Sequence, residues 1–207
     1  MLITSRAFVL RKILYNDTSI IVNAFLEDKG YISFIIQGAR KPKAKLNAAL
    51  FEIGNILELV YYYKENIALH KVKEARLLLI PQNTVTSMLR KAQVLFIADF
   101  VFKTMKNEHG NEQIFNLINT TVNAIENTSN PELSLHFAIQ CMQYFGIYDE
   151  QIFENNFLEK ALHHQIIFNN GNERKVLLDK ILKYFVQHHF DEKLLQMQSV
   201  EILKMIL

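Results

Sequence analysis

Four cations lie within six residues of this 207-residue sequence: Arg40, Lys41, Lys43 and Lys45. Pro42 disfavours helical backbone at Lys41 and stiffens the segment. Positive side chains at this density suit an extended polyanion such as a phosphate backbone, whose condensed counterions are released on binding. The stretch therefore predicts a nucleic-acid-binding loop, and the alternative is a solvated basic loop that only keeps the protein soluble.

Further cations and aromatic rings occur in runs that alternate like β-strands. Arg11 and Lys12 are sequence neighbours, so their side chains must point to opposite faces of a strand, and we expect only one of them to support the basic loop. Tyr61 and Tyr63 share one face of another predicted strand. Their rings could stack on bases, although tyrosines in strands also simply pack in a core.

Residues for bond-breaking chemistry do not form a recognisable pattern. Asp149, Glu150 and Glu154 could be imagined as the carboxylate ligands of a metal-dependent nuclease, but a solvated acidic face is the simpler interpretation. The sequence has no G-x-S-x-G nucleophile turn, no Walker-type loop and no dinucleotide-type glycine loop. We therefore expect no catalytic residues and no cofactor, in a protein that is not an enzyme.

Histidine and cysteine positions do not favour a metal site. The doublets His163-His164 and His188-His189 diverge on a helix and lack the spacing of zinc-protease motifs. Cys141 is the only cysteine, which excludes an internal disulfide and a cysteine-based zinc cluster. We expect no bound metal and a buried Cys141 on a helix.

The N-terminal part of the chain has the alternation and turn residues of β-strands. Apolar and β-branched runs are separated by Tyr15-Asn16-Asp17-Thr18, by Glu27-Asp28-Lys29-Gly30 and by Lys64-Glu65-Asn66. Five strands of this length fit an OB-type barrel. The predicted strands are residues 3–14, 19–26, 31–37, 50–63 and 67–79.

Beyond Pro81 the hydrophobic period changes from two residues to about 3.6, which predicts an all-helical domain. The fold class is therefore α+β, with an OB-fold domain at residues 1–80 and a helical domain at residues 81–207. Asn130-Pro131-Glu132 predicts a helix start, and residues 147–174 remain unassigned between helix and irregular structure. The other predicted helices are residues 85–106, 112–126, 175–189 and 191–206.

The formal charge differs in sign between the N-terminal and C-terminal parts of the chain. Residues 1–80 hold 12 Lys and Arg against 7 Asp and Glu, a formal charge of +5, whereas residues 81–207 hold 11 against 14, a formal charge of −3. This asymmetry indicates an anionic partner for the N-terminal part. Apolar runs are far shorter than the roughly 20 residues of a membrane span, and the N-terminal residues lack a secretory-signal pattern, so we expect a cytoplasmic protein with no membrane segment.

An ordered set of residues runs through the predicted N-terminal strands and the basic loop. Residues 8–22 have the sequence FVLRKILYNDTSIIV, followed by Phe25, by Gly30 and by GARKPK at residues 38–43. This order of a strand, a turn with an acid and a small polar residue, a hairpin glycine and a basic loop resembles the opening of the RecO family of DNA repair proteins.

The resemblance implies an OB fold that binds single- and double-stranded DNA, joined to a helical domain. Family members are recombination mediators that anneal complementary strands. With RecR they help load the RecA recombinase onto DNA covered by single-strand-binding protein, whose acidic C-terminal tail they bind. The resemblance also implies a nucleoid-associated location, and a tail pocket rimmed by Lys103 or Lys106 is an expectation.

Two departures from the family pattern have consequences. Many family members carry a four-cysteine zinc element in the helical domain, which a chain with Cys141 alone cannot form, so residues 147–174 are expected in its place. Ala44 stands where the family often has serine, which removes a possible phosphate hydrogen bond but leaves the charge of the loop.

A protein-interaction adaptor is the main alternative function. In that case the OB barrel binds a polypeptide, and the basic loop contacts an acidic partner without intrinsic DNA binding. The adaptor predicts little DNA affinity at about 0.1 M salt and no dependence on strand complementarity, because the salt-sensitive phosphate contacts are missing. A metal-dependent nuclease predicts instead magnesium-dependent cleavage.

Overall fold

The computed structural model divides the chain into two compact units. The described residues are 1–106, 110–153 and 156–207. Unit 1 consists of Met1–Pro81 with Met105–Asn119, and unit 2 consists of Gln82–Thr104 with Thr120–Leu207.

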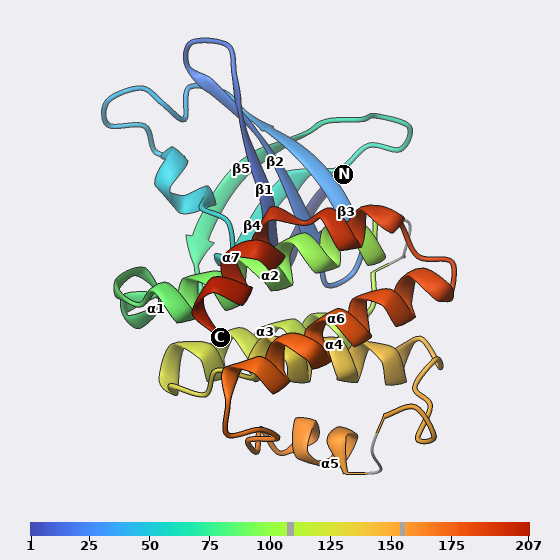
Figure 1. The fold of residues 1–207 in the computed structure, drawn as a ribbon. Coiled ribbons are helices and arrows are strands. Elements are labelled where there is room, and N and C mark those ends of the chain that lie inside the picture. Colours follow the sequence, from blue (N-terminus) through green and yellow to red (C-terminus); the bar gives the residue numbers. More distant parts are fainter. Residues whose placement is uncertain (107–109, 154–155) are drawn as a thin grey trace. The chain divides into compact units, whose positions relative to one another are not determined.

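Unit 1 is built on a closed β-barrel (Figure 1). Its strands are hydrogen-bonded in the order β1-β2-β3-β5-β4, and β1 pairs with β4 to close the ring. The β3–β5 pairing is parallel, whereas β1 and β2, β2 and β3, and β4 and β5 pair antiparallel. This arrangement confirms the predicted α+β class with an OB-type barrel. The strands are β1 (Leu2–Tyr15), β2 (Ser19–Leu26), β3 (Gly30–Ile36), β4 (Ile56–Tyr62) and β5 (His70–Leu77).

Turn residues set the ends of the first three strands. Asn16, in the β1–β2 turn, has a φ of 54°, a left-handed conformation that asparagine tolerates. Gly30, at the start of β3, has a φ of 68°, which costs glycine no steric clash. As a result β2 has the predicted bounds, and β1 and β3 differ from the prediction by one residue at each end.

The fourth strand is shorter at its N-terminal end than the predicted residues 50–63. A 3-10 helix, η1 (Ala48–Phe51), precedes it, and Asn47 caps this helix by accepting a hydrogen bond from Ala49 N at 2.9 Å. The prediction was wrong there because a side-chain cap, and not apolar alternation, determines the backbone. Strand β5 is likewise shorter than the predicted residues 67–79.

The barrel interior is filled by apolar side chains. The largest is Tyr61, whose side chain is fully buried and whose ring meets the ring of Phe34 edge-on, with 5.2 Å between the centroids. The buried interior consists of Ala7, Val9, Ile20, Val22, Ala24, Leu26, Phe34, Ile36, Ala39, Phe51, Leu57, Leu59 and Tyr61.

Unit 2 is helical in its described part (Figure 1). Helix α2 buries most of its circumference, as predicted for a central helix. No helix among the described residues is long and apolar enough to cross a membrane. The helices are α1 (Gln82–Thr86), α2 (Met88–Thr104), α3 (Glu112–Asn127, whose first half belongs to unit 1), α4 (Leu133–Tyr144), α5 (Phe157–Leu162), α6 (Gly171–Gln187), the 3-10 helix η2 (Glu192–Gln196) and α7 (Gln198–Ile206).

The helix predicted over residues 85–106 is interrupted. Helix α1 ends at Thr86 and α2 begins at Met88. Between them, Ser87 Oγ accepts a hydrogen bond from Arg90 N at 3.4 Å, which satisfies one backbone donor in the first turn of α2. A hydroxyl at this point therefore starts a new helix where apolar periodicity alone predicts continuity.

The last two predicted helices also differ from the structure. Helix α6 begins four residues before the predicted range of 175–189, because Asn170 caps it by accepting a hydrogen bond from Glu173 N at 2.9 Å. The predicted helix over residues 191–206 is a 3-10 turn followed by α7, with extended backbone at Met197 between them.

Asn130 organises the turn in front of α4. Its side-chain oxygen accepts a hydrogen bond from Glu132 N, and its Nδ2 donates to His164 O, both at 2.8 Å. Helix α4 itself begins at Leu133, so Pro131 lies in the turn before the helix instead of in its first turn as predicted.

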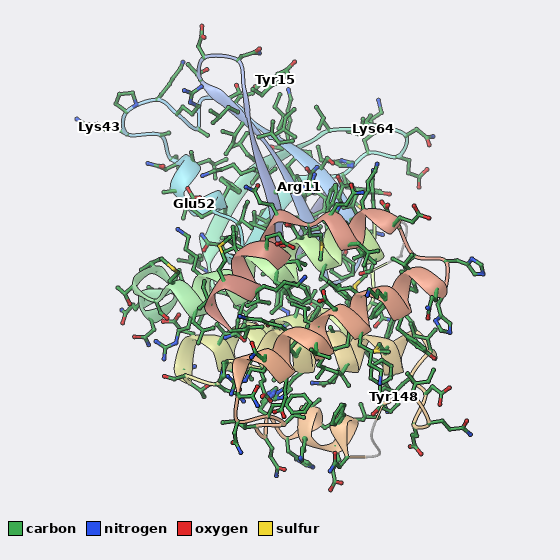
Figure 2. The ribbon with its side chains drawn as sticks, viewed as in Figure 1. Arg11, Tyr15, Lys43, Glu52, Lys64 and Tyr148 are labelled. Carbon is green, nitrogen blue, oxygen red and sulfur yellow. The ribbon has the colours of Figure 1, made fainter. Side chains whose placement is uncertain are left out.

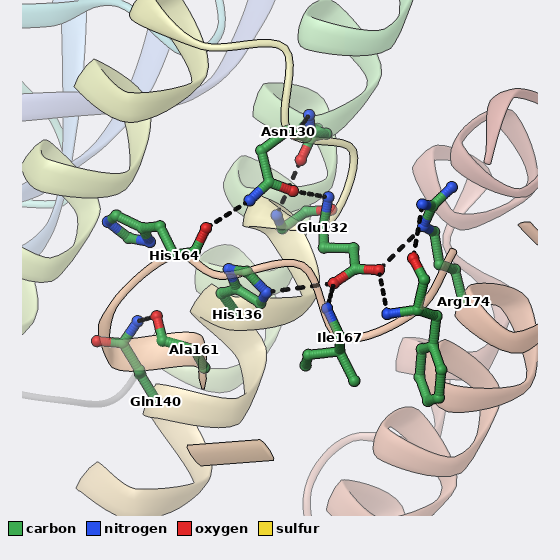
Figure 3. A network of polar contacts seen from close by, with 11 residues as sticks. Asn130, Glu132, His136, Gln140, Ala161, His164, Ile167 and Arg174 are labelled. Atoms are coloured by element: carbon green, nitrogen blue, oxygen red, sulfur yellow. Dashed lines mark hydrogen bonds and ion pairs between the residues drawn. The ribbon is translucent and has the colours of Figure 1, made fainter. Parts of the chain in front are cut away.

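A buried carboxylate holds the C-terminal end of residues 147–174, the segment that the sequence left unassigned (Figure 3). The side chain of Glu132 is fully buried and accepts hydrogen bonds from Ile167 N at 2.5 Å, Phe168 N at 2.9 Å and Arg174 Nε at 3.0 Å. These bonds fix an irregular connection onto α4 that has little regular structure of its own.

Candidate nucleic-acid interface

The four predicted loop cations are all exposed in unit 1. Arg40 fixes the loop to the β1–β2 turn: its backbone N donates to Thr18 O at 3.0 Å, and its Nη1 donates to Asn16 O at 3.1 Å. Figure 2 shows Lys43 on this loop and Tyr15 on the neighbouring hairpin. The structure therefore brings the loop cations beside the end of β1.

The loop that carries these cations, residues 37–47, is folded into turns. Lys41 N donates to Gly38 O at 3.0 Å, and Ala44 N donates to Lys41 O at 3.2 Å. Lys43 has a φ of 59°, the left-handed region that a second tight turn requires. At the base of the loop the side chain of Ala39 is buried in the barrel core, which anchors the loop to the barrel.

Arg11 and Lys12 point to opposite faces of β1, as predicted. Lys12 lies opposite Val22, whose side chain is in the barrel core, and it forms an ion pair with Glu52 (labelled in Figure 2). Arg11 lies opposite Asn23 on the outer face. A bulge in the register between Val9 and Arg11 shifts the alternation, so Val9 and Lys12 share a side although three positions separate them.

Tyr61 has no access to a nucleic acid. Its side chain is fully buried, so the base-stacking interpretation was wrong for this residue. Its hydroxyl finds no hydrogen-bond partner among the described residues. Burial, with further contributions from Asp28 and Tyr63, raises the pKa of the Tyr61 hydroxyl above its ordinary value. The Tyr61 ring packs in the barrel core.

Tyr63 is half-buried and already has ring partners. It stacks on His70 with 5.3 Å between centroids and 10° between planes, and Lys29 Nζ lies 5.3 Å from its centroid. Burial lowers the pKa of His70, only partly offset by a backbone hydrogen bond at Tyr62. A stacking role for Tyr63 stays a prediction.

Sequence reasoning missed the exposed end of strand β1. Ile13, Leu14 and Tyr15 are 50%, 66% and 41% exposed. The available signal was three consecutive large apolar residues directly before the Asn16-Asp17 turn. Strict alternation would have buried one side of such a run, but the hairpin end leaves both sides exposed.

The alternative acidic site is only partly described. Asp149 Oδ1 accepts a hydrogen bond from Gln151 N at 2.8 Å, and Asp149 O accepts one from Phe153 N at 2.9 Å, which makes this residue part of a turn. Glu150 is exposed, and Glu154 lies outside the described residues. Within the described ranges no group of three or more His, Cys, Asp or Glu is placed to hold a metal ion.

The other candidate residues are dispersed. Cys141 is buried, as predicted, and a single buried thiol does not fit a four-cysteine zinc element. Lys106 Nζ lies 6.0 Å from the centroid of Tyr31 in unit 1, whereas Lys103 is in the last turn of α2 in unit 2. A tail pocket rimmed by Lys103 or Lys106 stays a prediction.

The family model and the curated relatives that match this chain point to the same family. The family model "Recombination protein O N terminal" matches residues 1–80. The chain is 34% identical over 129 residues to the DNA repair protein RecO of Pelodictyon phaeoclathratiforme, covering 62% of this chain and 49% of the relative. It is 35% identical over 130 residues to that of Chlorobium phaeobacteroides (strain DSM 266), covering 63% and 49%.

A more distant relative is matched over a larger share of this chain. The DNA repair protein RecO of Bacteroides fragilis is 26% identical over 150 residues, covering 72% of this chain and 62% of the relative. The match spans about half the length of the first two relatives. Residues 1–80, which contain the closed barrel, therefore form a domain of the RecO family, and the chain is similar to RecO proteins over a longer stretch.

Proposed function

We propose that unit 1 binds DNA through its basic loop and that the protein acts in DNA repair as a recombination mediator that anneals complementary strands. The observation that carries the proposal is the set of four exposed loop cations, held beside the β1–β2 turn by Arg40, in a domain of the RecO family. The contacts are expected from Arg40, Lys41, Lys43 and Lys45, with Arg11 or Lys12 in support.

Annealing on such a surface requires no bond chemistry, and the proposed protein is not an enzyme. Two nucleic-acid strands repel each other because both are polyanions. A cationic loop lowers this repulsion and holds the strands close until base pairing supplies the free energy. Of the two supporting residues, Lys12 has part of its charge compensated by the ion pair with Glu52.

The proposed partners follow from the similarity to RecO proteins. They are single- and double-stranded DNA, RecR, the acidic C-terminal tail of single-strand-binding protein and, indirectly, the RecA recombinase. The relatives' names support a role in DNA repair. The proposed location is the cytoplasm, in association with the nucleoid.

Fluorescence anisotropy with labelled single- and double-stranded oligonucleotides over a salt series tests the DNA contact. Four phosphate contacts give a log–log salt slope near −3, since each contributes about −0.7 to −0.9. The variant R40A/K41A/K43A/K45A is expected to lose this slope and most of its affinity at low salt. The four side chains are exposed, so the substitutions leave the barrel core unchanged.

A charge-matched control separates a specific contact from a change in net charge. It removes four cations of unit 2 and is expected to bind DNA as the native chain does. Equal weak binding by the native chain and the loop variant would reject the loop and favour the adaptor alternative. Annealing of complementary oligonucleotides, measured with the same proteins, tests the mediator role. The control variant is K91A/K175A/K183A/K193A.

A further inference from the structure

The end of the β1–β2 hairpin exposes three consecutive apolar side chains. Ile13, Leu14 and Tyr15 follow one another and are 50%, 66% and 41% exposed. Isolated exposed apolar residues are ordinary, whereas three in a row at the end of one hairpin are a candidate binding surface. We name these three residues the hairpin tip.

The hairpin tip is held by regular strand pairing. Leu14 lies opposite Ile20, Ile13 lies opposite Ile21, and β1 and β2 remain paired up to the turn. Ile13 and Tyr15 share one face of the strand, and Leu14 is on the other. The tip therefore presents apolar groups on both of its faces from a backbone that needs no ordering on binding.

The hairpin tip and the basic loop are joined by hydrogen bonds. Arg40 donates to Asn16 O with its guanidinium and to Thr18 O with its backbone N, and both acceptors are in the turn that follows the tip. Lys41 and Lys43 are exposed on the same loop. Asp17 is the acidic residue of this turn, so the cations of the loop outnumber it.

An apolar tip beside a group of cations fits an unpaired nucleic-acid strand. A duplex presents phosphates and keeps its base faces stacked inside, so it could use the cations but not the apolar groups. An unpaired strand offers phosphates and free base faces together, and every base can stack on an aromatic ring. Aliphatic side chains are also used in proteins to pack against exposed base faces.

We propose that the hairpin tip contacts unpaired bases on both of its faces, with Tyr15 stacking on one base and Leu14, on the opposite face, packing against the next base. The loop cations hold the backbone of the same strand. This inference rests on the proposed DNA binding, and it predicts that the tip makes the protein bind single strands more tightly than duplexes.

Oligonucleotides with and without bases test this assignment. An abasic strand of equal length keeps every phosphate and lacks every base. The native chain is expected to bind the base-bearing strand at least about fivefold more tightly than the abasic strand. The variant Leu14→Ser with Tyr15→Ser is expected to bind both strands as weakly as the native chain binds the abasic one, with an unchanged salt slope.

A matched control exists at the opposite end of β1. Leu2 and Tyr62 are opposite each other in the β1–β4 pairing and are 48% and 53% exposed. Leu2→Ser with Tyr62→Ser changes the same residue types and should leave the preference for bases intact. Circular dichroism spectra of all variants should match the native spectrum, since exposed substitutions rarely unfold a protein.

The outcomes separate this inference from the proposed function. Equal binding of base-bearing and abasic strands by the native chain, with a steep salt slope, overturns the base contact but keeps the DNA-binding loop. A base preference that survives in the tip variant places the base contact elsewhere and also overturns the inference. Absence of binding to either strand overturns both proposals.

Discussion

The buried carboxylate of Glu132 holds a segment that has little helix or strand of its own. Its partners Ile167, Phe168 and Arg174 lie 35 to 42 residues away along the chain (Figure 3). Burial disfavours the charged carboxylate, but the hydrogen bonds from these groups and the His136 ring, whose Nε2 lies 3.5 Å from Glu132 Oε2, outweigh it and lower the pKa of Glu132 below its ordinary value. The Glu132 carboxylate is therefore charged, and it accepts the hydrogen bonds that hold the segment leading into α6.

Replacing this carboxylate should destabilise unit 2. Glu132→Ala leaves two backbone N–H groups and the Arg174 guanidinium without their acceptor, and such losses cost about 3–5 kcal/mol when one partner of a buried pair is removed. Urea unfolding should show the loss as a lower midpoint. Glu159→Ala, at an exposed position of α5, is the control. Equal midpoints for the two variants would contradict the assigned role.

At the scale of elements, side-chain caps determine several helix ends in both units. Asn47 caps η1, Asn170 caps α6 and Asp191 caps η2, each by accepting a hydrogen bond from a backbone N–H two or three residues ahead. These bonds satisfy donors that the first helical turn leaves unpaired. They explain why η1 interrupts a predicted strand and why α6 starts early.

The cap of α6 predicts a measurable stability change. Asn170→Ala removes the acceptor for Glu173 N and should lower the free energy of unfolding by about 1 kcal/mol. Asn170→Ser keeps a capping oxygen and should stay within a few tenths of the native value. Chemical denaturation of the three proteins at equal m-value measures both changes. A loss as large in the serine variant would show that the cap is not the cause.

At the scale of the whole molecule, each unit contains a histidine whose charged form is disfavoured by burial. In unit 1 burial lowers the pKa of His70, and in unit 2 burial and the neighbouring His136 lower the pKa of His164. The rings of His136 and His164 are stacked, with 6.1 Å between centroids. Folding therefore favours the neutral form of His70 and of His164.

Stability should consequently fall in mild acid. A histidine with a lowered folded-state pKa contributes its full stability above the unfolded value of 6.5, and this contribution is lost as the pH falls from there toward the folded pKa. The free energy of unfolding should decrease between pH 7.5 and 5.5. His70→Gln with His164→Asn should flatten the dependence, and asparagine tolerates the φ of 52° at position 164. Parallel pH profiles for the native and variant chains would refute the assignment.

Local pattern determined much of this protein. The turn residues Asn16 and Gly30 and the alternation between them are readable in the sequence, because they act on the backbone within a few residues. The change of hydrophobic period after Pro81 predicted the switch from strands to helices for the same reason. The basic loop is also a local feature, so its four exposed cations could be predicted as a group.

Tertiary structure alone decided which side of each element is covered. Alternation placed Tyr61 and Tyr63 on one face, but barrel closure buried Tyr61 completely. A bulge placed Lys12 on the side of the barrel core and beside Glu52, which no period-two rule foresees. The hydrogen bonds that Glu132 accepts likewise join segments that meet only after folding, and sequence spacing carries no record of such distant contacts.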